Sequence, residues 1–240
     1  MKKLGLIGGT GPESTIAYYR ALEYGVQKKL DKNYFPHMAV ESLSVFEVLD
    51  FCDREAYDDL AEYLISGMKN LAAAGCEVGT LTGITPHIVF DKLQAGSPIP
   101  VVSIVEAACE YCKNKGYGKI ALLGTYPTMT GTFFQKPFTA AGIEVVTPTE
   151  EEKQYIGGKI ESELELGNVV RETQDRVVGI VKRLKKDEDI DAFVLGCTEL
   201  PLLFEDVGMD IPSIDVMEVH IQKLIDVICE DKQGGGEYGQ

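Results

Sequence analysis

Short apolar runs alternate with longer amphipathic stretches along the 240 residues of this chain. The runs have the length of buried strands, and the stretches between them repeat their apolar residues at the period of a helix. This alternation predicts βαβ units, and therefore an α/β fold with parallel-rich sheets flanked by helices. The expected strands are Leu4–Ile7, Met38–Ser42, Val78–Leu81, Val101–Ser103, Ile120–Leu123, Glu144–Val146, Ala192–Leu195 and Ser213–Asp215. The expected helices include Asp58–Ala74, Ile104–Lys115 and Asn168–Lys185.

The two halves of the chain resemble each other. Residues 4–12 are similar to residues 120–127, and residues 79–86 are similar to residues 192–199, with nearly the same separation in each half. An internal duplication predicts two similar lobes related by a pseudo-twofold axis, with the active site in the cleft between them. A chance likeness between strand–glycine–threonine turns is the alternative, and the matched spacing favours duplication.

Proline and glycine indicate where the lobes divide. Pro98-Ile99-Pro100 is suited to a linker, so residues 1–98 form the first lobe and residues 99–210 the second. Residues 211–233 are expected to return to the first lobe. Residues 234–240 are rich in glycine and predict a flexible tail.

Composition excludes several kinds of partner. Lys and Arg number 23 against 38 Asp and Glu, a net charge of −15, so a nucleic-acid partner is not expected. No apolar run approaches the ~20 residues of a membrane helix, and no membrane partner is expected. The first residues lack the pattern of an export signal, so the six cysteines predict reduced thiols in a cytoplasmic protein.

Most cysteines and histidines have a structural interpretation. Cys109 and Cys112 lie in a helical stretch without a second pair of ligands, so no metal site is expected and both thiols should pack as small apolar groups. His87 could orient a substrate, but the helix start at Pro86 favours a role as a cap.

Cys197 is the strongest candidate for chemistry. It follows the buried strand at Ala192–Leu195 and Gly196, whose missing side chain leaves room for a ligand. Open α/β sheets bind ligands at the carboxyl ends of their strands, where Cys197 and Thr198 are expected. A thiol there becomes a nucleophile or base once its pKa falls below about 8.5.

Two other strand ends offer hydroxyls and backbone amides. Residues 8–15 follow the first strand with three glycines, and their N–H groups are suited to a carboxylate. Ser14 replaces the last glycine of the dinucleotide-binding fingerprint, so a simple helix entry is the alternative. Residues 82–87 end the matching strand of the first lobe.

Lys159 is a further candidate. It follows Gly157-Gly158, which are expected to open an acidic helix, and it could bind a second carboxylate of the substrate. A solvated lysine beside Glu161 and Glu163 is an equally good interpretation.

These motifs together resemble the aspartate/glutamate racemase family. The resemblance is carried by Gly8–Thr15, Thr85–Asp91 and Leu195–Leu200, in the family's order and spacing over the whole chain. It implies inversion at the α-carbon of an acidic amino acid without a cofactor, and a homodimer. In the family scheme two thiols face the substrate, and Cys197 corresponds to the one in the second lobe. Thr10 and Thr198 correspond to substrate ligands.

The first lobe departs from the family pattern. Many members have Cys-Asn-Thr where this chain has Gly83-Ile84-Thr85, so no thiol occupies that position. Thr82 or Thr85 could relay a proton through water, but an alcohol is a much weaker base than a thiol. The alternatives are a single-cysteine decarboxylase or lyase acting on a small diacid, and a non-catalytic dicarboxylate-binding protein.

The sequence therefore predicts a racemase of aspartate or glutamate with no cofactor and no metal. The expected catalytic residues are Cys197 and Thr82. The expected substrate-binding residues are Gly9, Thr10, Gly83, Thr85, Thr125, Lys159, Thr198 and Glu199.

Overall fold

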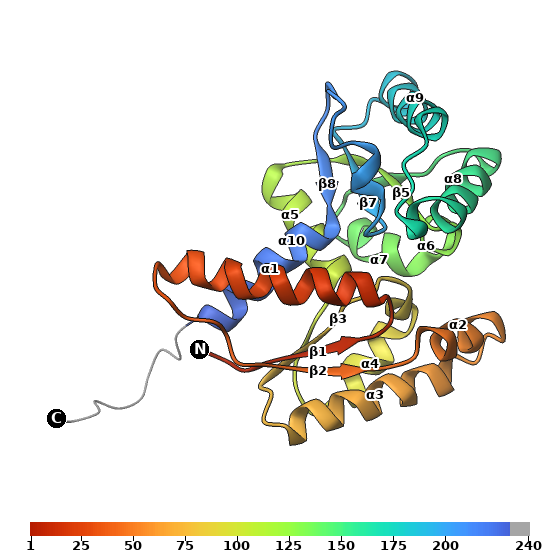
Figure 1. Ribbon diagram of the computed structural model, residues 1–240. Coiled ribbons are helices and arrows are strands. Elements are labelled where there is room, and N and C mark those ends of the chain that lie inside the picture. Colours follow the sequence, from red (N-terminus) through yellow and green to blue (C-terminus); the bar gives the residue numbers. More distant parts are fainter. Residues whose placement is uncertain (231–240) are drawn as a thin grey trace. The chain divides into compact units, whose positions relative to one another are not determined.

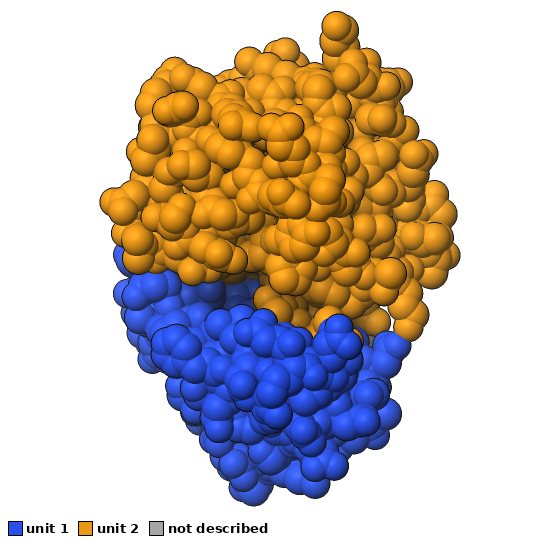
Figure 2. All heavy atoms as spheres, turned by 90° about the vertical axis from the view of Figure 1, so that its right-hand side faces the viewer, with its two compact units in different colours: residues 1–83, 89–102, 221–240 blue, residues 84–88, 103–220 orange. Residues whose placement is uncertain are grey.

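A computed structural model describes residues 1–230 of the chain. The chain divides into two compact units, shown in separate colours in Figure 2. The first unit holds residues 1–83, 89–102 and those from Ile221 on, and the second holds residues 84–88 and 103–220. Among the described residues no helix is long and apolar enough to cross a membrane.

The first unit is built on a four-stranded parallel sheet in the order β2-β1-β3-β4. Its strands are β1 (Leu4–Gly8), β2 (Met38–Ser42), β3 (Val78–Leu81) and β4 (Val101–Val102). Every residue of β1 and β3 is buried, as expected for central strands that are covered on both faces. The carboxyl end of β1 therefore lies beside that of β3, with Ile7 paired to Leu81.

Helices cover both faces of this sheet. Figure 1 shows α1 and α3 on opposite sides of β1 and β2. The helices of the unit are α1 (Pro12–Leu30), α2 (Val45–Asp53), α3 (Tyr57–Ala73), α4 (Phe90–Gly96) and the part of α10 (Val216–Cys229) from Ile221 on. Lys29 of α1 forms an ion pair with Asp226 of α10, which joins the last helix to the first.

The second unit repeats the same strand order as β6-β5-β7-β8, again all parallel. Its strands are β5 (Lys119–Gly124), β6 (Glu144–Val146), β7 (Ala192–Gly196) and β8 (Ser213–Asp215). The predicted fold class is therefore confirmed, and all eight predicted strands are present.

Alternating side chains of β5 and β7 define two apolar layers. Leu123 and Leu195 belong to the cluster that contains residues of α8 and α9, and Leu122 and Val194 belong to the cluster with residues of α5 and α7. Cys197 continues the alternation of β7 on the α8 and α9 side. The helices are α5 (Ile104–Lys115), α6 (Tyr126–Thr130), α7 (Thr132–Ala140), α8 (Glu150–Ser162) and α9 (Arg171–Glu188), with short 3₁₀ turns η1 (Thr85–Val89), η2 (Leu164–Leu166) and η3 (Leu200–Leu203).

Two details differ from the sequence expectation. β8 pairs with β7, so this strand lies in the second unit, whereas we expected the first lobe to resume at residue 211. Helix α8 begins at Glu150, because Thr149 and Glu152 form a capping box, and Gly157-Gly158 lie inside the helix instead of opening it. The tail expected at residues 234–240 lies outside the described residues.

Candidate active site

The second unit brings its candidate residues to the carboxyl ends of β5 and β7. Gly124 and Gly196 end the two strands side by side. Thr125 follows the first, and Cys197, Thr198 and Glu199 follow the second. The Thr125 hydroxyl lies 2.9 Å from the hydroxyl of Thr128. The strands thus place two hydroxyls, a thiol and a carboxylate at one edge of the sheet.

Cys197 and Thr198 share one carboxylate. The Cys197 thiol donates to Oε2 of Glu199 at 2.9 Å, and the Thr198 hydroxyl donates to Oε1 at 2.7 Å. Cys197 is 6% exposed, and its apolar neighbours belong to the cluster on the α8 and α9 side. The sequence placed this sulfur at a ligand-binding strand end; the structure buries it, and its polar contacts are with Glu199.

The electrostatics at Cys197 favour the neutral thiol. Burial raises the pKa of Cys197 well above its ordinary value, and the charges of Glu199 and Glu165 raise the pKa further. Burial and the nearby charge of Glu199 also raise the pKa of the Glu165 carboxyl. The expected fall in the Cys197 pKa is therefore absent.

Lys159 is already paired. It forms an ion pair with Glu163 one helical turn on, and the same carboxylate accepts the Thr173 hydroxyl at 2.6 Å. The Glu163 contact raises the pKa of Lys159, and Lys159 and Thr173 lower the pKa of Glu163. The charge that was expected to meet a substrate carboxylate is thus compensated within the second unit.

In the first unit, the Thr82 hydroxyl links the ends of β1 and β3 through hydrogen bonds. It is fully buried, and its hydroxyl lies 3.1 Å from the Ile7 carbonyl and 3.0 Å from the Thr15 hydroxyl. Thr15 in turn accepts the Gly9 N–H at 3.0 Å and donates to the Gly11 carbonyl. This network closes the turn after β1 and leaves the Thr82 hydroxyl occupied.

Gly83 and Thr10 approach each other closely at this end of the sheet. A Cβ atom on Gly83 would lie 2.8 Å from the Thr10 carbonyl oxygen and 2.9 Å from Thr10 Oγ1. Thr10 Oγ1 is buried and has no hydrogen-bond partner among the described residues. Thr85 begins η1 and is half-buried. Thr10 therefore offers an unused hydroxyl, and position 83 has no room for a side chain.

His87 has a structural position that the sequence did not locate. It is 3% exposed, and Nε2 accepts the N–H of Ile104 at 3.3 Å. Nδ1 lies 3.1 Å from the Ile84 carbonyl and so carries the proton. His87 thus caps the start of α5 instead of the turn that begins at Pro86.

Glu165 is the residue that sequence reasoning missed. It lies in η2, more than thirty positions before Cys197, and its charge acts on the Cys197 thiol. Only its place in an acidic stretch marked it in the sequence.

Cys109 and Cys112 are free and buried as predicted, and burial raises the pKa of Cys112 to about 12. Within the described residues no group of three or more His, Cys, Asp or Glu side chains could hold a metal ion.

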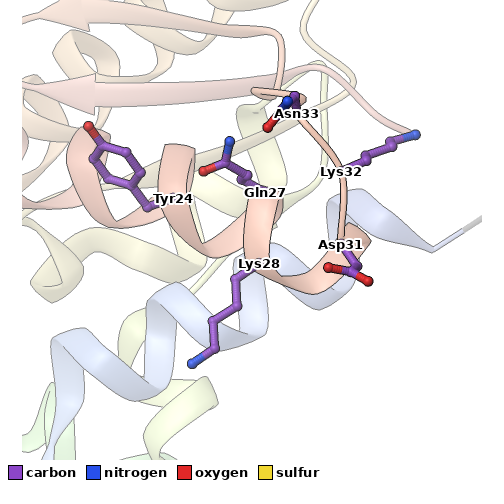
Figure 3. Close-up of a pocket in the computed structure, with 6 residues that line it drawn as sticks. All are labelled: Tyr24, Gln27, Lys28, Asp31, Lys32 and Asn33. Carbon is purple, nitrogen blue, oxygen red and sulfur yellow. The ribbon is translucent and has the colours of Figure 1, made fainter.

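A pocket of about 400 Å³ lies away from these strand ends. It sits where α1 ends, the opposite end of that helix from the Gly9–Gly11 turn (Figure 3). Its lining is formed by Tyr24, Gln27, Lys28, Asp31, Lys32 and Asn33. The lining contains no thiol or histidine, and it is separate from the chemistry of Cys197.

Known proteins resemble this chain over most of its length. The family described as Asp/Glu/Hydantoin racemase matches residues 7–224. The broad specificity amino-acid racemase RacX of Bacillus subtilis (strain 168) is 25% identical over 88% of this chain and 92% of its own length. A crystal structure from Yersinia pestis, of a candidate Asp/Glu racemase, has a TM-score of 0.91 at 30% identity and covers 96% of this chain and 100% of that one. PH1733 of Pyrococcus horikoshii OT3, an aspartate racemase homologue, has a TM-score of 0.85 at 36% identity with the same coverage.

Proposed function

Because this chain belongs to the Asp/Glu/Hydantoin racemase family, we propose that it is an amino-acid racemase that works without a cofactor and uses Cys197 as its acid/base. The observation that carries the proposal is the thiol at the end of β7, hydrogen-bonded to the Glu199 carboxylate at 2.9 Å. A carboxylate at that distance can accept the thiol proton and leave a thiolate, which is the form that removes an α-proton.

The proton steps follow from this pair. Glu199 takes the proton of the Cys197 thiol, and the thiolate then takes the α-proton of the amino acid, so that the C–H bond breaks and an S–H bond forms. The carbanion regains a proton at the same carbon. Each unit offers predicted substrate ligands: Thr10 and the backbone N–H groups near Gly9 in the first, and Thr85, Thr125 and Thr198 in the second.

Return of the proton to the opposite face needs a second donor. The residues that end β1 and β3 include no thiol, and the Thr82 hydroxyl is engaged with Ile7 and Thr15. We therefore propose that α-proton exchange at one face is faster than inversion. The expectation of aspartate or glutamate as substrate rested on the family resemblance and on Lys159 as a ligand for the side-chain carboxylate. Because Lys159 is paired with Glu163, only the resemblance still supports that expectation.

The test is α-proton exchange in heavy water, followed by NMR for a panel of acidic, neutral and basic L-amino acids, with chiral chromatography to measure inversion. We expect exchange by the wild type and a loss of about 10²–10⁴-fold in Cys197→Ala, the usual contribution of a general acid/base. Cys52→Ala is the matched control, because Cys52 is a free thiol on α2 in the other unit. Absence of exchange with every amino acid would refute the proposal.

A single-thiol decarboxylation or elimination is the second candidate. The crowding at Gly83 favours it, because the first unit has no room there for the second thiol of a two-base racemase. Carbon dioxide release from a substituted malonate, lost in Cys197→Ala and without α-proton exchange on any amino acid, would identify that activity. Thermal stabilisation by a dicarboxylate with neither reaction would indicate a binding protein.

A further inference from the structure

Among the described residues, the segments that follow the strands lack cationic side chains. The carboxyl ends of parallel strands are where α/β sheets hold their ligands. Within residues 1–230, none of the four residues that follow any of the eight strands is Lys or Arg. Four of those positions are glutamate: Glu106, Glu150, Glu199 and Glu218. A substrate with two carboxylates would meet no cation at any of these segments.

Glu199 differs from the other three glutamates in what it does. Glu106, Glu150 and Glu218 lie in the first turns of α5, α8 and α10, where a carboxylate stabilises the helix dipole. The Glu199 side chain makes no cap, and both of its oxygens accept hydrogen bonds from Cys197 and Thr198. Its negative charge is therefore placed at the reactive sulfur and not at a helix end.

The cation that the sequence offered as a substrate ligand is not available to offset this charge. Lys159 is the cation that the sequence offered for a second carboxylate, and its ammonium pairs with Glu163, which is further held by Thr173. Glu165 adds a second negative charge that acts on Cys197, and the charge of Glu199 in turn acts on Glu165. Among the described residues, the charges that act on the thiol are thus those of two carboxylates, Glu199 and Glu165.

We propose that this protein acts on amino acids whose side chains carry no negative charge, and that it prefers basic side chains to acidic ones. The proposal rests on the amino-acid racemase activity proposed above and names its substrate class. One α-carboxylate can be held by hydroxyls and backbone N–H groups, such as those that follow β5 and β7 in the same unit as Glu199. A side-chain carboxylate would add a third negative charge near Glu165 and Glu199, whereas a side-chain ammonium would be attracted to them.

The test compares L-lysine, L-methionine and L-glutamate in the heavy-water exchange assay. We expect kcat/KM for lysine to exceed that for glutamate at least about tenfold, the effect of one partly screened charge contact, with methionine between them. Glu165→Gln should reduce the lysine-to-glutamate ratio several-fold. Glu205→Gln removes the same charge from an exposed position after η3 and should leave the ratio unchanged.

The inference is overturned by a lysine-to-glutamate ratio at or below one, by a ratio that Glu165→Gln leaves unchanged, or by a Lys159→Met protein that loses turnover of glutamate alone. Thermal stabilisation by lysine or glutamate separates this inference from the proposed activity, because it needs no turnover. Greater stabilisation by lysine supports the charge preference even if no exchange is found, and greater stabilisation by glutamate refutes it. Exchange that favours glutamate would refute the inference and leave the racemase proposal standing.

Discussion

A cysteine at position 83 would place a thiol at the strand end where the family resemblance leads one to expect it. The backbone around Gly83 opposes this change. Any Cβ atom there would lie 2.8 Å from the Thr10 carbonyl oxygen and 2.9 Å from Thr10 Oγ1. Both contacts are shorter than 3.0 Å, a separation that real Cβ atoms essentially never show. A threonine hydroxyl can rotate away, but the carbonyl oxygen moves only with the turn that follows β1.

The expected cost can be worked from this overlap. Inserting atoms into a packed site usually costs about 1–3 kcal/mol, so Gly83→Ala and Gly83→Cys should each lower the free energy of unfolding by that amount. For a chain of this length the melting temperature should fall by about 2–4 °C per kcal/mol. Gly158→Ala is the control: Gly158 lies inside α8 with no atom within 4 Å of its Cβ position, so the substitution should stabilise the helix by about 0.5–1 kcal/mol.

Thermal melts of the three variants and the wild type would measure these shifts, and α-proton exchange with chiral analysis would show any gain in inversion. A Gly83→Ala protein as stable as the wild type would show that the turn yields without cost. A Gly83→Cys protein that is stable and inverts its substrate faster would refute the conclusion that this strand end cannot hold a thiol.

Three further changes test individual contacts. The pKa of Cys197 is raised in the folded state, so the stability linked to its proton is complete below pH ~8.5 and falls above it. The free energy of unfolding of the wild type should therefore fall by up to about 1.4 kcal/mol per pH unit above pH ~8.5. Denaturant titrations should show that Cys197→Ser lacks this contribution to the pH dependence. Thr82→Val should cost about 0.5–1.5 kcal/mol from lost hydrogen bonds with α-proton exchange retained; a hundredfold fall in exchange would instead make Thr82 a proton carrier. Glu199→Gln removes a charge that raises the Cys197 pKa, so the absorbance of the Cys197 thiolate should appear at lower pH than in the wild type. Cys197→Ser gives the background absorbance of the other thiols. An unchanged titration of Cys197 would contradict its contact with Glu199.

The strands were predictable because burial on both faces leaves a simple pattern. β1, β3, β5 and β7 are short runs made mostly of apolar residues and glycine, and each ends in a glycine or is followed directly by a turn that contains one. Only the ends of these elements moved by a residue or two. The strand ends therefore indicated correctly that Thr10, Thr125 and Cys197 follow central strands.

The Lys159 environment was missed although the sequence contained the signals. Thr149 and Glu152 have the spacing of a capping box, which places the start of α8 well before Gly157. Once that start is known, Lys159 and Glu163 are four residues apart on one helix face and form an ion pair. An incorrect helix boundary therefore left a paired lysine among the candidate substrate ligands.

The protonation of Cys197 could not be obtained from local sequence. The thiol is buried by residues of other elements in its cluster, and Glu165 comes from a turn far earlier in the chain. A strand-end cysteine also suggests activation, because many such thiols lie beside cations. Here the neighbouring charges are negative: Glu199 lies two residues on in the sequence, and the fold brings Glu165 to the sulfur.

A raised thiol pKa and a base role for the same thiol are compatible if the substrate supplies the missing positive charge. Every amino acid carries an α-ammonium, and bound near Glu199 and Glu165 it would offset their effect on Cys197 and lower the pKa of the thiol. The pH profile of kcat/KM reports the free enzyme and that of kcat reports the complex. We therefore expect the rise in kcat to occur at lower pH than the rise in kcat/KM, and a lysine substrate to widen the gap relative to methionine. Coincident profiles for both substrates would mean that the substrate charge does not reach Cys197, and the proton would then have to leave the sulfur through Glu199 alone.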